Sequence, residues 1–335
     1  MAAFDLSFDE LQRYAPRLRE PEDFEEFWAS TLDDAREHEL DVRLEPVESG
    51  LLAVRTWDVC FNGFGGDRIR GWLHIPRSAL TTATGKLPAV VEYRGYGGGR
   101  GLPHESVFWA TAGYAHFVMD TRGQGSGWST GDTPDPTGSG PAHPGFMTRG
   151  ILDPRDYYYR RVFVDAIRAV AAVRQHDAID GTHIIVAGVS QGGGIALAVA
   201  GLMNDVAAVM PDVPGLCNWE RAIEITDRSP YAEITQYLRV HRDRRDEALR
   251  TLSYFDCALL GRRANAPALF SVALMDQVCP PSTVYAAFNA YAGPKAIRVY
   301  PYNDHEGGEG FQQAEQLSWL RELFAAQLSG LTAGD

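Results

Sequence analysis

The residue pattern with the clearest chemical meaning is a serine between glycines, Gly188-Val189-Ser190-Gln191-Gly192, at G-x-S-x-G spacing. Such a serine can act as a nucleophile when a strand ends in a tight turn that opens directly into a helix. An apolar run at 183–187 precedes the pattern, and a run of small apolar residues at 193–200 follows it. Glycines suit this turn because a Cβ would collide with the neighbouring strand and helix. The sequence therefore predicts Ser190 as a catalytic nucleophile.

A second match to the same pattern, Gly127–Gly131, is centred on Ser129. No strand-like run precedes it, and Pro134 and Pro136 follow it closely. Because the strand-turn-helix context is missing, we do not expect Ser129 to be a nucleophile.

A serine hydroxyl needs a general base, and the base needs an orienting carboxylate. In this type of sheet the chain order is serine, acid, histidine. His305 lies in a glycine-containing loop after the last strand-like run and is the predicted base, whereas His241 lies in a charged segment and is expected at the surface. Asp276 directly follows the strand-like run 269–275 and is the predicted acid. Asp304 is the alternative, but neighbouring side chains on an extended segment point apart.

Acyl transfer also needs donors for the developing oxyanion. The backbone N–H of Gln191, which follows the nucleophile, is one expected donor. The second is expected at Tyr96, in the glycine-rich segment 95–101 that follows an earlier strand. That segment matches neither G-x-G-x-x-G nor a phosphate-binding loop, so a dinucleotide site is not expected. The reaction predicted from these residues requires no metal ion and no organic cofactor.

The elements around these residues alternate between short apolar runs and helical patterns. Such alternation is typical of an α/β fold with a mostly parallel central sheet and helices on both faces, where chemistry gathers at the carboxyl ends of the strands. Before it, two runs predict an antiparallel pair at 51–61 and 68–75. The expected strands of the alternating part are 88–93, 115–119, 182–187, 207–210, 268–273 and 296–300, and the expected helices are 157–175, 192–203, 281–291 and 310–327.

Composition excludes several classes of partner. The chain has 335 residues and a formal net charge of −13, which disfavours nucleic acid and anionic membrane surfaces. No apolar run approaches the roughly 20 residues that span a bilayer, and no signal peptide is visible at the N-terminus. The four cysteines show no C-x-x-C spacing and are expected as free thiols, which suggests a cytoplasmic protein.

Several blocks in order give the chain a specific family resemblance. It resembles the acetyl xylan esterase/cephalosporin C deacetylase family (carbohydrate esterase family 7) of the α/β-hydrolases. The blocks are Arg94-Gly95-Tyr96, Asp120-Thr121-Arg122-Gly123-Gln124-Gly125, Gly145-Phe146-Met147-Thr148-Arg149-Gly150-Ile151, Tyr157-Tyr158-Tyr159-Arg160-Arg161, the Ser190 pattern, Met275-Asp276-Gln277-Val278-Cys279-Pro280-Pro281 and His305-Glu306-Gly307-Gly308.

The resemblance implies a catalytic triad and an oxyanion hole. The triad would be Ser190, Asp276 and His305, and the oxyanion donors would be the backbone N–H groups of Tyr96 and Gln191. It further implies a cytoplasmic homo-oligomer, typically a hexamer, that deacetylates small substrates such as xylo-oligosaccharide acetates, sugar acetates and cephalosporin C.

Two positions in the resembling blocks carry further expectations. The family usually has histidine where this chain has Arg94, which puts in question the packing of residues 94–101, called the oxyanion loop below. For Arg122 the resemblance suggests a buried residue that ties loops together.

The domain expectation is one α/β-hydrolase domain over residues 1–335. It would carry an N-terminal helical extension at 1–45, a helical cap insertion at 217–263 and a long loop at 123–150. The alternatives are a related hydrolase and a protein of this fold that only binds ligands. A related peptidase would usually carry a large extra domain, and a dienelactone hydrolase would have cysteine in place of Ser190.

Overall fold

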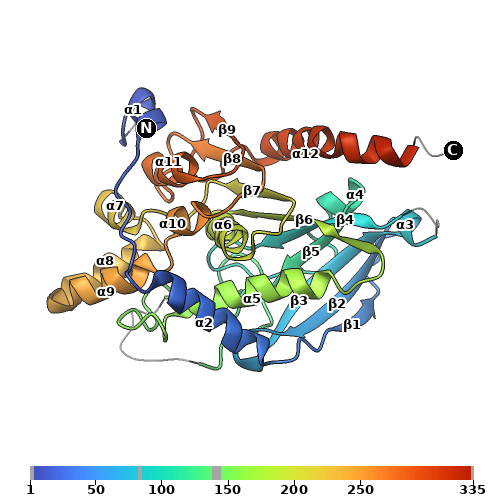
Figure 1. Cartoon of the computed structure of the whole chain (residues 1–335), viewed down its shortest axis with the longest axis horizontal. Helices are drawn as coiled ribbons and strands as arrows, with labels where there is room; N and C mark the ends of the chain where they lie inside the picture. The colour runs from blue at the N-terminus through green and yellow to red at the C-terminus, as the bar shows by residue number, and fades with distance from the viewer. Residues whose placement is uncertain (1–3, 82–84, 138–144, 333–335) are drawn as a thin grey trace.

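A nine-stranded sheet forms the centre of the computed structural model, which describes residues 4–81, 85–137 and 145–332 (Figure 1). Its strand order is β1-β2-β3-β5-β4-β6-β7-β8-β9. The strands are β1 (Arg43–Val47), β2 (Val54–Asn62), β3 (Arg68–Pro76), β4 (Leu87–Tyr93), β5 (Ala115–Met119), β6 (Ile179–Val189), β7 (Ala208–Asp212), β8 (Ala268–Ala273) and β9 (Lys295–Tyr300).

The helices precede, connect and follow these strands. They are α1 (Phe8–Arg13), α2 (Phe24–Arg36), α3 (Arg77–Thr81), α4 (Phe108–Thr111), α5 (Tyr158–Val173), α6 (Gln191–Met203), α7 (Trp219–Ile225), α8 (Tyr231–Val240), α9 (Arg245–Ser253), α10 (Cys257–Gly261), α11 (Pro281–Ala290) and α12 (Glu309–Thr332). Short 3-10 turns lie at Phe64–Gly66 and Arg242–Arg244. No helix in the described ranges is long and apolar enough to cross a membrane.

The sheet is antiparallel at one end and parallel through the rest. The expected antiparallel pair is confirmed as β2 and β3, which run in register from Val54 opposite Pro76 to Asn62 opposite Arg68. From β5 through β4 to β9 every neighbouring pair is parallel. The mostly parallel α/β fold expected from the sequence is therefore confirmed, and the carboxyl ends of these strands meet at one edge.

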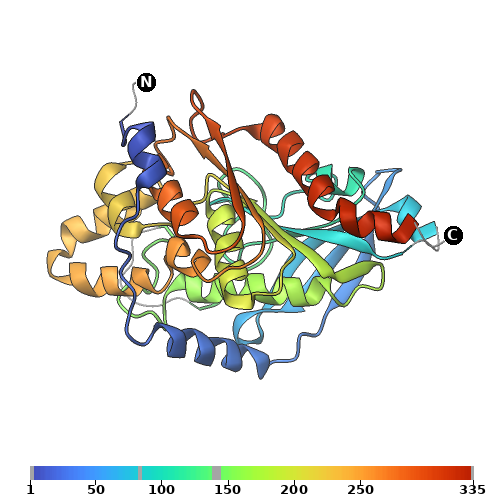
Figure 2. The same cartoon turned by 45° about the horizontal axis from the view of Figure 1, so that its top comes forward.

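Helices cover both faces of the sheet. Along β6, Ile184 and Val186 pack into one buried cluster, which also contains residues of α2, α5 and α6. The residues that alternate with them, Ile185 and Ala187, pack into a second cluster with residues of α4 and α12. This alternation follows from the two-residue period of a strand. Figure 2 shows the result, with α5 on one side of the sheet and α12 on the other.

The N-terminal segment contains two helices and then an edge strand. Ser7 and Glu10 form a capping box at the start of α1, in which the Glu10 carboxylate accepts the Ser7 N–H at 2.8 Å. The segment 1–45 was expected to be helical, but Arg43–Val47 forms β1, antiparallel to β2. Four of the five β1 residues are exposed and the strand contains Pro46, so it has no apolar alternation that would have predicted it.

Four helices, α7 to α10, follow β7 and lie within residues 217–263. Figure 1 shows α7, α8 and α9 grouped together at the end of the molecule away from β1 to β3. Their polar faces are exposed, and their apolar residues, such as Leu249 and Leu252, join the cluster formed by α5 and α6. The helical content expected for this insertion is therefore present.

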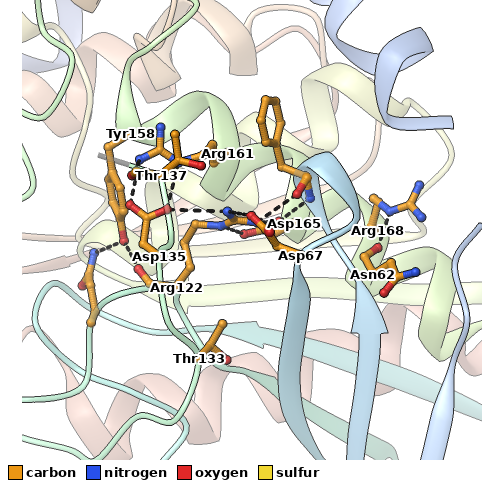
Figure 3. Close-up of polar contacts among 12 residues, drawn as sticks. Asn62, Asp67, Arg122, Thr133, Asp135, Thr137, Tyr158, Arg161, Asp165 and Arg168 are labelled. Carbon is orange, nitrogen blue, oxygen red and sulfur yellow. Dashed lines mark hydrogen bonds and ion pairs between the residues drawn. The ribbon is translucent and has the colours of Figure 1, made fainter. Parts of the chain in front are cut away.

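A buried network of ion pairs holds Arg122 and Asp135, which lie in the described part of the segment between β5 and α5 (Figure 3). Arg122 has no exposed surface and donates to both oxygens of Asp165, at 2.6 and 2.8 Å, and to Asp67 at 2.9 Å. Asp135 accepts two hydrogen bonds from Arg161, at 2.9 and 2.7 Å. The expectation that Arg122 is buried and ties loops together is confirmed. Residues 138–144 of the expected long loop lie outside the described residues.

Candidate active site

Ser190 lies in a sharp turn between β6 and α6, as the sequence predicts. It is the residue before the first turn of α6 and has a positive φ of 59°. A Cβ on Gly188 would lie 2.4 Å from the carbonyl carbon of Gly192, and a Cβ on Gly192 would lie 2.1 Å from the Tyr93 oxygen. The two glycines are therefore required by close backbone packing. This turn presents the Ser190 side chain at the carboxyl edge of the sheet.

Asp276 and His305 are in direct contact. Asp276 follows β8 and His305 follows β9, and the Asp276 Oδ2 lies 2.9 Å from the His305 Nδ1. Asp276 is fully buried, and its other oxygen accepts the N–H groups of Val278 and Cys279, each at 2.8 Å. The competing carboxylate, Asp304, instead accepts the backbone N–H of His305 at 2.9 Å. The structure thus pairs the imidazole with Asp276.

Ser190 and His305 line the same pocket, which has a volume of about 540 Å³ and also borders Tyr96. Within the described residues no hydrogen bond joins Ser190 to His305, and the Ser190 Oγ lies 3.8 Å from the Cys279 Sγ. Contacts between a catalytic serine and its base are often long without substrate and tighten in the complex. The pocket therefore brings Ser190 and His305 together, and the buried Asp276 contacts His305 from behind.

The two expected oxyanion donors belong to residues close to Ser190, since Gln191 follows it in the chain and Tyr96 lines the same pocket. Gln191 is the first residue of α6, so its N–H has no acceptor within the helix. The Tyr96 N–H takes part in none of the loop backbone hydrogen bonds among the described residues. Its carbonyl does have a partner, since the Trp128 indole N–H donates to it at 2.9 Å. Both N–H groups are thus left available beside the serine.

A buried group of side chains joins the two donor segments. The Gln191 amide oxygen accepts from Gln124 at 2.9 Å and from the Tyr159 hydroxyl at 2.7 Å. The Gln191 amide nitrogen donates to the Arg94 carbonyl at 3.1 Å. The Gln124 amide oxygen accepts the N–H of Gly97 at 2.7 Å. The segment 94–97 and the start of α6 are therefore held in a fixed relation.

Arg94, the departure from the family pattern, is neutralised within its own loop. Its guanidinium donates to Glu92 at 2.6 Å and to the Gly99 carbonyl at 3.1 Å, and it lies 4.9 Å from the centre of the Trp128 ring. Burial acts to raise the pKa of Glu92, but hydrogen bonds and charges from His116 and Arg94 outweigh it and lower this pKa to about 2. Arg94 thus braces the oxyanion loop and the Trp128 ring.

The second G-x-S-x-G segment lies in a loop and lacks the strand-turn-helix setting of Ser190. It packs backbone to backbone against the oxyanion loop, because the N–H of Gly99 donates to the Ser129 carbonyl at 3.0 Å and that of Gly101 donates to Thr130 at 2.9 Å. The Ser129 hydroxyl is buried and has no hydrogen-bond partner in the described part of the chain. His241 is the C-terminal cap of α8, and its ring packs at a tilt against Tyr237, with ring centres 4.5 Å apart.

The described residues contain one group that could offer three donor atoms to a metal ion: Asp276, Cys279 and His305. Asp276 and His305 already bind each other, and burial and then the Asp276 charge raise the pKa of Cys279 well above its usual value. Metals bind the thiolate form of cysteine, which this environment disfavours. The arrangement therefore suits an acid–histidine pair better than a metal centre. All four cysteines are free thiols.

Three residues at this site were not singled out by the sequence. Trp128 belongs to the rejected serine motif, yet its ring lines the pocket. Cys279 contacts Ser190, and its only sequence signal is its place three residues after Asp276. Glu233 of α8 bonds the Tyr96 hydroxyl across 137 residues of sequence, a contact that no local pattern indicates.

Comparisons with known proteins identify the family of the chain. The family model for acetyl xylan esterases matches residues 1–323. The structure of an acetyl xylan esterase from Paenibacillus sp. R4 has a TM-score of 0.87 and 36% identity, covering 96% of this chain and 99% of that chain. Acetyl xylan esterase 1 from Thermoanaerobacterium sp. JW/SL YS485 has a TM-score of 0.86 and 32% identity, covering 96% of this chain and 100% of that chain.

A curated relative agrees as well. Acetyl esterase Axe7A from Xylanibacter ruminicola is 28% identical over 315 residues, which are 92% of this chain and 68% of that protein. The resemblance expected from the sequence blocks is therefore confirmed, and the chain belongs to the acetyl xylan esterase family, carboxylic ester hydrolases of the α/β-hydrolase fold.

Proposed function

We propose that this protein removes acetyl groups from small esters through an acetyl-enzyme on Ser190. The observation that carries the proposal is the 2.9 Å contact between Asp276 and His305 at the pocket that also holds Ser190. A buried carboxylate on Nδ1 leaves the other imidazole nitrogen free to act as the base.

The reaction would proceed in two halves. His305 takes the Ser190 hydroxyl proton as the oxygen attacks the ester carbonyl, and the N–H groups of Tyr96 and Gln191 hold the oxyanion. His305 then gives this proton to the departing alcohol, and the acetyl group stays on the Ser190 oxygen as an ester. In the second half His305 takes a proton from water as the water oxygen attacks the acetyl carbonyl. The ester bond to Ser190 then breaks, acetate leaves, and His305 returns the proton to the Ser190 oxygen.

The size and lining of the pocket favour a small substrate. Its volume of about 540 Å³ lies within the roughly 300–1,000 Å³ of sites for small molecules. Apolar side chains form much of its wall, including Val189, Val278 and Trp128. Such a wall suits an acetyl group and one face of a sugar ring. We therefore propose acetylated xylo-oligosaccharides and sugar acetates as substrates, with cephalosporin C as a further candidate.

The experiment that tests this proposal compares p-nitrophenyl acetate with the butyrate and longer esters. We expect the acetate to give the highest kcat/KM, and we expect acetate release from acetylated xylo-oligosaccharides and from cephalosporin C. A preference for long acyl chains would refute the acetyl assignment and leave the triad standing. Absence of turnover on every ester would instead favour the alternative of a ligand-binding protein of this fold.

We also propose that the chain assembles into a homo-oligomer, a hexamer by family resemblance. In support, Tyr302 and Phe311, on either side of the His305 loop, are each 84% exposed. Large exposed aromatic side chains are candidates for burial by a second chain. Light scattering on the purified protein tests this, and a monomer at micromolar concentration would refute it.

A further inference from the structure

Glu233 of α8 connects three segments that are far apart in sequence. Its Oε1 accepts the hydroxyl of Tyr96 at 2.6 Å, and its Oε2 accepts the backbone N–H of Met147 at 3.0 Å. The Tyr96 hydroxyl in turn accepts the N–H of Phe146 at 2.7 Å. One carboxylate from the inserted helices is thus bound to the oxyanion loop and to the segment before α5.

The space around this carboxylate is closely fitted. A Cβ on Gly145 would lie 1.8 Å from the Glu233 Oε1, so no other residue fits there without moving the carboxylate. The Tyr96 ring packs edge-on against Phe146, with ring centres 5.9 Å apart. Both the hydroxyl and the ring of Tyr96 are therefore fixed by neighbours on other segments.

The backbone on either side of Tyr96 is held by Gln191 at Arg94 and by Gln124 at Gly97, and the Tyr96 side chain adds a further anchor. Tyr96 lies between Gly95 and Gly97, and Gly97 has a φ of 79°. Glycines give the chain more conformational freedom than any other residue. The Trp128 indole binds the Tyr96 carbonyl, and Glu233 binds the Tyr96 hydroxyl. Tyr96 is thus held through both its backbone and its side chain, which sets the direction of its own N–H.

The phenol is suited to this role. Burial, followed by the Glu233 charge and hydrogen bond, raises the pKa of Tyr96 well above its usual value, so the hydroxyl keeps its proton and donates. Hydrogen bonds to a charged acceptor are about twice as strong as neutral ones. The bond therefore constrains Tyr96 more strongly than a neutral partner would.

We propose that Glu233 is a positioning residue of the oxyanion hole: through the Tyr96 hydroxyl it fixes the Tyr96 N–H that receives the oxyanion. The role rests on the acetyl transfer proposed above. It makes the inserted helix α8 a part of the catalytic machinery, although Glu233 does not itself line the pocket.

The test uses Glu233→Ala, Glu233→Gln and Tyr96→Phe, assayed on p-nitrophenyl acetate. Loss of one oxyanion donor costs roughly 10²–10³ in kcat, so a misaligned donor should cost roughly 10- to 100-fold. We expect this loss in kcat with KM changed by less than about threefold. Glu233→Gln keeps one acceptor oxygen and should lose less than Glu233→Ala. The Tyr96→Phe/Glu233→Ala double variant should lose no more than the worse single variant, because both break the same bond.

A second readout separates positioning from general structure. The rate at which a p-nitrophenyl alkylphosphonate modifies Ser190 also depends on stabilising an oxyanion, so it should fall by the same factor as kcat. Glu224 is an exposed glutamate on α7, and Glu224→Gln is the matched control, which should leave both rates unchanged. If Glu233→Ala fails to fold, Glu233→Gln and Tyr96→Phe decide the outcome.

Failure of this inference is distinguishable from failure of the proposed function. Full activity in Ser190→Ala would refute the acetyl-enzyme, and with it the premise. If Ser190→Ala is inactive while the Glu233 variants keep kcat and the phosphonylation rate within twofold, the positioning role is refuted. A loss confined to KM, with unchanged phosphonylation, would also refute it.

Discussion

Two segments of this chain share the G-x-S-x-G pattern and do different work. At 188–192 the pattern lies between a strand and a helix, and Ser190 has a positive φ and faces the pocket. At 127–131 the pattern lies in a loop, and its backbone pairs with the oxyanion loop through Gly99 and Gly101. The comparison teaches that the glycines in both are fixed by close backbone contacts, while only the elements that flank Ser190 provide the strand-turn-helix setting expected of a nucleophile.

The largest expected difference between the segments is in turnover. Ser190→Ala should lower kcat by roughly 10⁴-fold or more, because removal of the nucleophile leaves only the contribution of the oxyanion hole and binding. The measurement is steady-state hydrolysis of p-nitrophenyl acetate. Mass spectrometry of the quenched wild-type reaction should place the acetyl group on the peptide that contains Ser190. An acetyl group on the Ser129 peptide would reverse the comparison.

The site residues were predictable from sequence where a local pattern marks them. Ser190, Asp276 and His305 each follow an apolar run that forms a strand. Because these strands are parallel, their carboxyl ends meet at one edge of the sheet. The family membership and the α/β fold followed from the same blocks and are confirmed. The catalytic roles themselves stay predictions until the variants are measured.

The rest could not be predicted because it depends on contacts between distant segments. Glu233 meets Tyr96 only once α8 is packed beside the segment that contains Tyr96, and within its own helix nothing distinguishes it from an ordinary surface glutamate. The edge strand β1 forms by pairing with β2 and carries no apolar alternation of its own. Tertiary pairing, not local propensity, decides such elements.

A smaller difference is expected at the first glycine of each segment. A Cβ on Gly188 would lie 2.4 Å from a backbone carbon of Gly192, whereas a Cβ on Gly127 would lie 3.0 Å from the Gly97 oxygen. Gly188→Ala should therefore destabilise the fold by about 3 kcal/mol or more, and Gly127→Ala by about 1 kcal/mol. Urea unfolding of both variants measures this. Equal losses would mean that the loop is packed as rigidly as the turn at Ser190.

The turn at Ser190 is also tied to a titrating group. The backbone oxygen of Asp212 accepts the Ser190 N–H at 2.9 Å, and its carboxylate accepts the amides of Gln312 and Gln316 at 2.8 and 2.7 Å. Burial, reinforced by the charge of Glu92, raises the pKa of Asp212 to about 7, although its hydrogen bonds act in the opposite direction.

This raised pKa predicts a loss of stability as pH rises. The folded state holds the Asp212 proton more tightly than the unfolded chain, so the stabilisation is complete below pH 4 and is lost as pH rises through about 7. Between pH 5 and 7 the change should be about 2 kcal/mol. Asp212→Asn should remove this part of the pH dependence, as measured by urea unfolding at both pH values.

Comparing the wild type with Asp212→Asn isolates the contribution of this one residue. Asp256, whose pKa burial raises to about 6, contributes equally to both proteins and cancels in the difference. Identical pH slopes in the two proteins would show that Asp212 does not titrate in this range.

The smallest expected effect is at Ser129. Its hydroxyl is buried and unpartnered among the described residues, so Ser129→Ala removes a polar group that gains nothing from the fold. The free energy of unfolding should stay within about 0.5 kcal/mol of wild type or rise slightly, and kcat should stay within about twofold. The backbone contacts of this segment with Gly99 and Gly101 do not involve the hydroxyl and should persist. A large loss of activity in Ser129→Ala would mean that the hydroxyl, and not only the backbone, supports the oxyanion loop.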